Sequence, residues 1–299
     1  MNLKILILGA SGMIGHNLYN EMINQAPPLN VYFLTSKSKN SLKNFNIFNL
    51  NRGYFEIKYF DFQNLMKILT TLRPDFVINC CGITKQKCIK ENTLNIQKIN
   101  IDLPRFLSDH SKILNYKLIL LSSDCVFSGK KGNYKITDKK DADDLYGLSK
   151  SNSEFMNSST LILRKSTIGL ELNDKHGLLE WFLSQNGIIK GYKNAIFNGL
   201  TTRELAKIII FIINKHSHLT GLYHLGSEDI NKYDLLIKIL NLIKNFKKNI
   251  IIEPYNDFYC NRSLDCSKFY NITKYKKPNW DEMLQQLKIE IVKKYYENS

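Results

Sequence analysis

Hydrophobic residues follow two patterns that alternate along this chain. The run from Ile5 to Leu8 is apolar at every position, which is typical of a strand buried on both faces of a parallel sheet. Behind it, Ile14, Leu18 and Met22 recur at the spacing of one helix face. This succession of a short apolar run and a longer amphipathic stretch continues through the first half of the chain, so we expect strands and helices to alternate there.

The strands expected before residue 169 lie at 5–8, 31–34, 54–60, 76–82, 118–121 and 160–163. Strands joined by helices form a parallel sheet covered on both faces, so residues 1–168 are predicted to be an α/β domain with a Rossmann-type doubly wound parallel sheet. Beyond it the pattern loosens into helices and short strands, predicted at 178–184, 201–215, 222–225 and 233–246. Residues 169–299 are predicted to form a smaller α+β substrate lobe over the carboxyl ends of the strands, with some chain exchange between the two domains.

The turn after the first strand has the spacing Gly9-x-x-Gly12-x-x-Gly15. In a strand–turn–helix unit, the first glycine allows a tight turn and the second lets a diphosphate approach the backbone. The third lets helix and strand pack closely, and the N–H groups at the helix start face the diphosphate. We therefore expect a dinucleotide here; the alternative is a strand–helix turn that binds nothing.

The end of the second strand bears on which dinucleotide binds. Residues 35–39 contain hydroxyls and lysines but no carboxylate. A carboxylate would hold the ribose 2′-hydroxyl of NAD, whereas Ser36 and Lys37 suit a 2′-phosphate, which favours NADPH over NADH. A solvated turn is the alternative. Asp61, after the third strand, is expected to cap the next helix or to accept a hydrogen bond from adenine.

Composition narrows the class of protein. The chain has 42 Lys and Arg against 27 Asp and Glu, a formal net charge of +15. The lysines are scattered rather than gathered in a stripe, so no nucleic-acid partner is expected, although a basic surface attracts anionic ligands. We expect neither a membrane span nor a signal peptide, and hence a cytoplasmic location. The six cysteines include no Cys-x-x-Cys pair, so no zinc site or disulfide framework is expected.

Tyr146 and Lys150 stand four residues apart in a predicted helix, which places them about one turn apart on one face. A free phenol has a pKa near ~10, and a neighbouring ammonium lowers that pKa by favouring the phenolate. The pair would then exchange protons at neutral pH. Ser123, at the end of the fifth strand, could bind the same carbonyl oxygen. These three residues are the candidates for catalysis; a chance spacing of tyrosine and lysine is the alternative.

These motifs resemble those of the extended short-chain dehydrogenases/reductases: the glycine turn, the segment Ser122-Ser123-Asp124-x-Val126-Phe127-x-Gly129 and Tyr146-x-x-x-Lys150. More narrowly, the chain is similar over nearly its whole length to the dTDP-4-dehydrorhamnose reductase family. The resemblance implies NADPH-dependent reduction of the C4 keto group of a nucleotide-linked 4-keto-6-deoxy sugar, in polysaccharide or O-antigen precursor synthesis. It also implies that Tyr146 gives the proton, that Lys150 tunes it and holds ribose, and that Ser123 hydrogen-bonds the oxygen.

The remaining site predictions combine strand ends with this resemblance. Besides Tyr146 and Lys150, the residues expected to bind the cofactor are Gly9, Ser11, Gly12, Met13, Ile14, Gly15, Ser36, Lys37, Asp61, Phe62, Cys81, Gly82, Ile83 and Ser122. Those expected to bind the substrate are Lys85, Asp124, Cys125, Val126, Phe127, Trp181 and Arg262. Some relatives have a metal-associated acid where this chain has His16, so no metal is expected and His16 is predicted to lie at the surface. A homodimer is the default expectation for the fold.

Several alternatives stay open. Cys125 stands where the family usually has tyrosine, so the sugar, its nucleotide and the product stereochemistry are not fixed. An epimerase or dehydratase of the same superfamily is one alternative function, although a dehydratase would need an acidic pair where Asp124 and Cys125 stand. A non-catalytic NADP-binding regulatory subunit is another. Asn100 is either an asparagine that positions a water or simply a polar helix residue, and Trp181 either stacks on a ligand or belongs to the core.

Overall fold

The computed structural model describes residues 3–25, 29–45, 47–51, 53–58, 61–172, 175–243 and 249–295. Its centre is a seven-stranded sheet in the order β10-β6-β5-β4-β1-β2-β3, in which every neighbouring pair is parallel. The strands are β1 (Lys4–Leu8), β2 (Asn30–Thr35), β3 (Tyr54–Glu56), β4 (Phe76–Asn79), β5 (Lys117–Ser123), β6 (Thr160–Lys165) and β10 (Gly221–His224). The predicted Rossmann-type sheet is confirmed.

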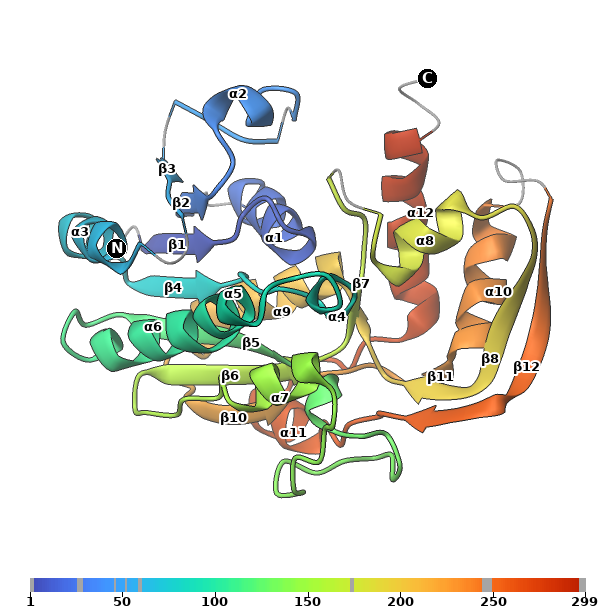
Figure 1. Ribbon diagram of the computed structural model, residues 1–299. Coiled ribbons are helices and arrows are strands. Elements are labelled where there is room, and N and C mark those ends of the chain that lie inside the picture. The colour runs from blue at the N-terminus through green and yellow to red at the C-terminus, as the bar shows by residue number, and fades with distance from the viewer. Residues whose placement is uncertain are drawn as a thin grey trace.

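Helices cover both faces of this sheet (Figure 1), with α5 (Thr93–Gln97) and α6 (Leu103–Ser111) in front and α9 (Thr202–Lys215) behind. This layering explains why residues 5–8 of β1 are all apolar. Ile5 and Ile7 belong to one core cluster, which includes α9 and α1 (Met13–Ile23). Leu6 and Leu8 belong to a second cluster on the opposite face, with α6 and α3 (Phe62–Leu72). Alternate side chains therefore enter two different cores.

Two expected strands end earlier than predicted. The strand expected at 54–60 ends at Glu56, and residues 59 and 60 lie outside the described residues. The strand expected at 76–82 ends at Asn79. There the Asn79 side chain accepts a hydrogen bond from the Cys81 backbone N–H at 3.1 Å, which turns the chain away from the sheet.

The chain returns to the central sheet after residue 200. β10 pairs in parallel with β6, with Gly221 opposite Leu161, and so becomes an edge strand of the main sheet. α9, just before it, packs against α1. α9 and β10 lie in the range predicted for the substrate lobe, but they are part of the Rossmann-type layer. The edge of β6 is free to pair with a parallel strand, and β10 occupies it.

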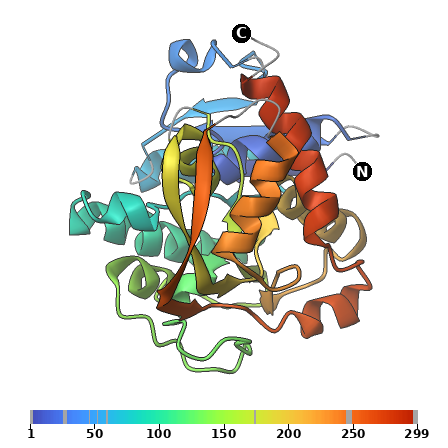
Figure 2. The same cartoon turned by 90° about the vertical axis from the view of Figure 1, so that its right-hand side faces the viewer.

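The second lobe stands beside the carboxyl ends of the strands (Figures 1 and 2). Its three-stranded sheet has the order β11-β8-β12, and α10 packs on it. The bounds are β8 (Gly187–Phe197), β11 (Ile230–Asn231), β12 (Ile250–Asn261), α8 (Leu178–Ser184), α10 (Lys232–Ile243), α11 (Ser267–Thr273) and α12 (Trp280–Tyr295). Two short strands, β7 (Thr167–Ile168) and β9 (Leu200–Thr201), pair in parallel. β7 precedes α8 and β8 of the second lobe, and β9 follows them, so this pair connects the segment that leads into the lobe with the segment that leads back to α9.

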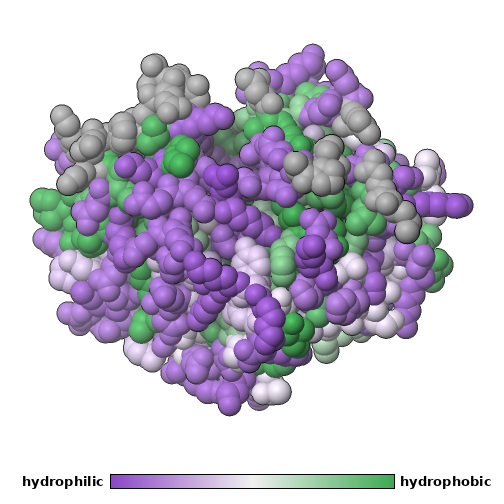
Figure 3. All heavy atoms as spheres, turned by 180° about the vertical axis from the view of Figure 1, so that it is seen from behind, coloured by the Kyte–Doolittle hydropathy of each residue, from purple (hydrophilic) through white to green (hydrophobic). Residues whose placement is uncertain are grey.

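The remaining short elements are α2 (Lys39–Leu42), α4 (Lys85–Cys88), the π-helical turn η1 (Lys98–Asp102), the 3-10 turn η2 (Asp124–Val126) and α7 (Leu145–Ser151). Hydrophilic side chains cover most of the rear face, with apolar groups in scattered patches (Figure 3). Within the described residues, no helix is long and apolar enough to cross a membrane.

Candidate active site

The glycine turn between β1 and α1 leaves no room for side chains at two of its positions. Gly9 has a φ of +77°, and a Cβ there would lie 2.8 Å from the Cys81 backbone nitrogen. A Cβ on Gly15 would lie 2.2 Å from the Gly9 carbonyl oxygen. The tight turn and the close helix–strand packing predicted for these glycines are confirmed. Gly12 is the N-cap of α1, so the turn presents bare backbone at a helix start, which fits a dinucleotide diphosphate.

Gly15→Ala is expected to weaken NADPH binding by at least about tenfold and to lower the free energy of unfolding by roughly 1–3 kcal/mol, because the added methyl group pushes α1 away from the turn. Fluorescence titration of NADPH and urea unfolding measure the two effects. Gly177→Ala is the matched control for stability, since a Cβ there meets nothing closer than 3.4 Å. Wild-type cofactor affinity in Gly15→Ala would contradict the assigned role of this turn.

The end of β2 lies against the glycine turn. The Gly9 and Ala10 N–H groups both donate to the Leu34 carbonyl, at 2.9 and 3.2 Å. The Ser11 and Thr35 hydroxyls hydrogen-bond at 2.8 Å. Ser36 and Lys37, which follow Thr35, therefore lie next to the turn that was predicted to hold the diphosphate. Further along the same edge, Asp61 accepts from the Asn64 N–H at 3.0 Å and caps α3, and Phe62 stacks on Phe106 at 4.8 Å between ring centroids.

Asn100 links the loop after β4 to α7. It is 1% exposed, and its Oδ1 accepts from the Ile83 N–H at 2.8 Å. Its Nδ2 donates to the Ile83 carbonyl at 3.1 Å and to Ser149 Oγ at 2.9 Å. Asn100 is therefore a buried residue that hydrogen-bonds this loop directly, and not simply a polar residue of a helix. Gly82 and Ile83, predicted to bind the cofactor, are thereby tied to α7.

A proline explains the local shape of the helix that carries Asn100. Pro104 has no N–H, so it cannot donate to the carbonyl four residues earlier, which is that of Asn100. The helix widens into the five-residue π turn η1 at this point and continues as α6. The helix is therefore bulged before Pro104 and not broken there.

The structure brings Ser123, Tyr146 and Lys150 together. Asp144 caps α7 through a hydrogen bond from the Gly147 N–H at 2.9 Å. A Cβ on Gly147 would lie only 2.3 Å from the Cys125 carbonyl oxygen, so α7 packs directly on η2, which follows Ser123. The Lys150 ammonium enters from the same helix and donates to the Leu121 carbonyl of β5 at 2.7 Å.

Burial is the main influence on the pKa of the Tyr146 phenol. Burial raises the pKa of Tyr146 above its usual range, the neighbouring Cys125 raises it further, and Ser123 acts in the opposite direction. The expectation that Lys150 would lower this pKa is wrong for this arrangement, because burial dominates and the ammonium is directed to the Leu121 carbonyl. Tyr146 is therefore protonated at neutral pH, which is the form that can donate a proton to a ketone oxygen.

Lys150 titrates in an accessible pH range. Burial, followed by repulsion from Lys165, lowers the pKa of Lys150 to about 8. Its ammonium form is present below that pH and lost above it, so the affinity for NADPH is expected to fall as the pH rises through about 8, if Lys150 holds the ribose. Equilibrium titrations of NADPH between about pH 6.5 and pH 9.5 test this. Lys150→Met should bind more weakly and flatten the profile; an equally steep decline in that variant would assign the titration to another group.

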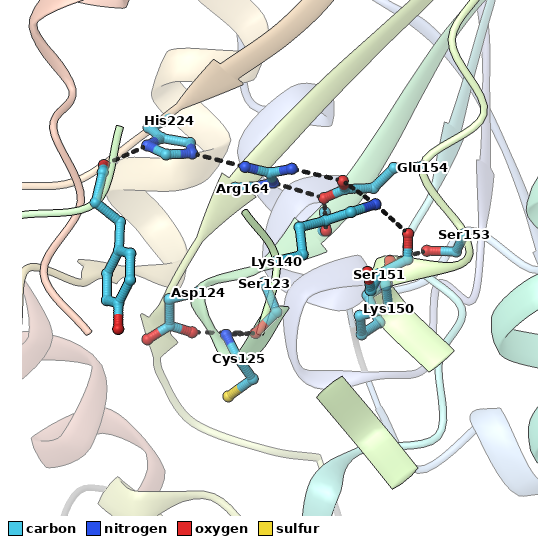
Figure 4. Close-up of polar contacts among 12 residues, drawn as sticks. Ser123, Asp124, Cys125, Lys140, Lys150, Ser151, Ser153, Glu154, Arg164 and His224 are labelled. Carbon is cyan, nitrogen blue, oxygen red and sulfur yellow. Dashed lines mark hydrogen bonds and ion pairs between the residues drawn. The ribbon is translucent and has the colours of Figure 1, made fainter. Parts of the chain in front are cut away.

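The predicted substrate residues meet around the turn after β5. Ser123 Oγ donates to Asp124 Oδ1 at 3.0 Å and accepts from the Cys125 N–H at 3.1 Å (Figure 4). Arg262 reaches this turn from the end of β12, and its Nε donates to the Phe127 carbonyl at 2.8 Å. Burial and then Asp124 raise the pKa of Cys125 to about 12, so it is a neutral thiol. Lys85 pairs with Asp144 at 2.8 Å and is about half exposed, at the mouth of the same site.

Other predicted residues lie differently from what was expected. Val126 and Phe127 are fully buried in a separate cluster with Tyr134, so only their backbone can reach a substrate. Ser122 is 2% exposed and its hydroxyl donates to Glu154 Oε1 at 2.7 Å, which leaves that hydroxyl unavailable to a cofactor. The indole of Trp181 is 37% exposed on α8, and no ring contact or side-chain hydrogen bond ties it to the described residues.

His16 corrects a prediction. It was expected at the surface but is 8% exposed, because α1 buries it beside Glu180 and Lys294 of the second lobe. Its Nδ1 hydrogen-bonds the Gly12 carbonyl at 2.8 Å, and burial lowers its pKa to about 4. Within the described part of the chain, no group of three or more His, Cys, Asp or Glu side chains could hold a metal.

Arg164, near the end of β6, forms a buried ion pair with Glu154. Arg164, 3% exposed, donates to both oxygens of Glu154 at 2.7 Å (Figure 4). His224 accepts from Arg164 at Nε2 and donates from Nδ1 to the Tyr134 carbonyl. Burial and the adjacent guanidinium lower the pKa of His224 to about 4, so it is a neutral, structural histidine.

Two cations in the site escaped the sequence analysis. Lys165 lies directly opposite Ser123 in the β5–β6 register, so an aligned pair of strand ends could have pointed to it. Lys232, at the start of α10, interacts with Asp124 and Cys125. No local pattern marks Lys232, because the lobe that carries it reaches the site only after the whole chain has folded.

The fold and these residues define a class of protein. A Rossmann-type sheet with a glycine turn at β1 and with serine, tyrosine and lysine gathered at its carboxyl edge is that of the extended short-chain dehydrogenases/reductases, which are NAD(P)-dependent oxidoreductases. Within that class, the model of the family described as the RmlD substrate binding domain matches residues 3–292. The chain belongs to this family.

Solved structures show the same fold. A hypothetical dTDP-4-dehydrorhamnose reductase from Sulfolobus tokodaii is 24% identical, with 90% of this chain and 94% of that chain covered and a TM-score of 0.73. The dTDP-4-dehydrorhamnose reductase of Bacillus anthracis, in complex with NADP, is 20% identical, with 97% and 100% covered and a TM-score of 0.77. Among curated proteins, methionine adenosyltransferase 2 subunit beta of Bos taurus is 25% identical over 154 residues, which span 51% of this chain and 42% of that protein.

Proposed function

We propose that this protein uses NADPH to reduce the C4 keto group of a nucleotide-linked 4-keto-6-deoxy sugar, in the synthesis of a polysaccharide precursor. The observation that carries the proposal is the gathering of Ser123, Tyr146 and Lys150 at the strand ends next to the glycine turn. Family membership and the names of the similar structures support a nucleotide-sugar reductase. Ser36 and Lys37 beside the turn, with no carboxylate, support NADPH.

The residues divide the chemistry among them. NADPH, when bound, supplies the hydride. Tyr146 donates its phenolic proton to the oxygen that becomes a hydroxyl, and Ser123 donates a hydrogen bond to the same oxygen. To do so, Ser123 must turn its hydroxyl from Asp124 to the substrate. Lys150 holds the ribose, for which its ammonium must turn from the Leu121 carbonyl to the cofactor. Asn100 keeps the cofactor loop in register with α7.

The experiment is a single-turnover assay of NADPH oxidation, followed at the nicotinamide absorbance, with a panel of dTDP-, UDP- and GDP-linked 4-keto sugars. Oxidation with one sugar and not with the others identifies the substrate. The same panel with NADH tests the cofactor preference. Faster turnover with NADH than with NADPH would contradict the role given to Ser36 and Lys37.

A second candidate function is a regulatory subunit that binds NADP without turning over a substrate. The observation favouring it is the match to a protein named as a subunit, which spans less than half of that relative. The intact set of Ser123, Tyr146 and Lys150 favours the enzyme instead. Tight NADPH binding without oxidation by any sugar in the panel would support the subunit.

A further inference from the structure

Lys232 carries an ammonium group from the second lobe into the active site. It is the first residue of α10, and its Nζ lies 3.6 Å from the centroid of the buried Phe197 ring. Its charge interacts with Asp124 and Cys125 of the η2 turn, and with Cys260 and Arg262 at the end of β12. The ammonium thus lies between the catalytic strand end and the lobe.

No carboxylate of the described residues forms an ion pair with Lys232. Within the described residues, Lys232 makes no side-chain hydrogen bond or ion pair, and its ammonium lies over the Phe197 ring. Burial lowers its pKa to about 8. The side chain is only partly exposed, and its three N–H donors have no acceptor among the described residues, so they are available to a ligand. Lys193 in the same lobe offers a contrast, because it also stacks on a ring, that of Tyr233, but pairs with Asp234 at 3.5 Å.

The charges around Lys232 do not balance. Lys165, Arg262 and Lys85 also interact with the carboxylates of this site, which are those of Asp124 and Asp144. Four cations and two carboxylates leave two positive charges over. Arg262 is anchored, since its Nε and Nη2 donate to the carbonyls of Phe127 and Ser128 at 2.8 and 3.3 Å. A ligand group with two negative charges, held next to Ser123 and Asp124, would compensate this excess.

We propose that Lys232, together with Arg262, binds the diphosphate that links nucleoside and sugar in the substrate. This inference rests on the proposed function, since a nucleotide-linked sugar carries such a group with one negative charge on each phosphate. The Phe197 ring holds the ammonium from one side and leaves its N–H donors directed to the ligand. Lys232 is then a positioning residue: it fixes the diphosphate, and the attached sugar is held against Ser123 and Tyr146.

Calorimetric titration of dTDP into the full chain, saturated with NADP⁺, tests this proposal. The bound NADP⁺ blocks the diphosphate site at the glycine turn, so only the substrate side is titrated. Lys232→Met is expected to weaken dTDP binding by about tenfold or more, whereas Lys232→Arg retains most of the affinity. Lys193→Met, the matched control, should bind dTDP like the wild type. Inorganic pyrophosphate should compete with dTDP in the wild type and much less in Lys232→Met.

Equal dTDP affinity in the wild type and Lys232→Met would overturn the proposal, and so would a wild type that binds none of dTDP, UDP and GDP. Lys232→Met breaks no ion pair and should unfold at the wild-type temperature or above it; if it does not fold, Lys232→Gln takes its place in the same titration. The two proposals fail separately. If Lys232→Met loses dTDP binding while the wild type reduces no keto sugar, the diphosphate site is supported and the reductase function is rejected. Turnover in Lys232→Met with an unchanged KM would reject this site alone.

Discussion

Tyr146→Phe is expected to lower kcat for keto-sugar reduction by about 10²–10⁴-fold, because the substrate oxygen then loses its proton donor. The phenol is suited to this role by its burial, which raises its pKa and keeps it protonated until hydride transfer creates a stronger base beside it. The change removes one oxygen and leaves the ring packed against the cluster that contains Ile83 and Cys88, so the fold should be unaffected. Stopped-flow measurement of NADPH oxidation gives the rate.

NADPH affinity separates this loss from damage to the cofactor site. Tyr146→Phe should bind NADPH about as tightly as the wild type, whereas Lys150→Met should lose both affinity and rate. Tyr134→Phe is a suitable control, because this phenol is also buried but lies in the neighbouring cluster, where it accepts from the Gly129 N–H. Wild-type turnover in Tyr146→Phe would show that another group supplies the proton.

Arg164→Met is expected to lower the free energy of unfolding by about 3–5 kcal/mol, because it leaves the Glu154 carboxylate buried without its partner. Burial favours the neutral acid, but the hydrogen bonds and charge of Arg164 hold the pKa of Glu154 below its usual range. In the wild type, the pair therefore stabilises the fold above the unfolded-state pKa of a glutamate and is lost as the pH falls through the lower, folded-state value. In the variant, Glu154 must take up a proton at higher pH.

Lys140→Met is the matched control for that prediction. Lys140 bonds the same carboxylate, with Nζ 3.3 Å from Oε2, but its side chain is 34% exposed. Its removal should cost under about 1 kcal/mol, as exposed ion pairs generally do. Urea unfolding at pH 7 and pH 5 measures both variants. The deficit of Arg164→Met should shrink at the lower pH, and a deficit below about 1 kcal/mol at pH 7 would show that the pair is not a main support of the sheet.

The agreement between sequence and structure follows from how local each feature is. The apolar run at β1, the glycine turn and the four-residue spacing of Tyr146 and Lys150 each lie within one element or one turn, so backbone geometry sets them without reference to the rest of the chain. Asp61 as the cap of α3 belongs to the same group. Expectations based on a single residue type were less reliable: His16, polar and near a helix start, proved buried because α12 and α8 close over it.

The sequence alone determined the parallel α/β class and the glycine turn, and it singled out Ser123, Tyr146 and Lys150, which the structure brings together. Tertiary structure alone decided that β10 completes the main sheet, that Val126 and Phe127 turn inward, and that Lys232 and Arg262 meet at Asp124. The physical reason is sequence separation. About a hundred residues lie between Asp124 and Lys232, and no short-range periodicity specifies which distant surfaces pack together. Only the docking of α10 and β12 beside the strand ends brings these charges into one site.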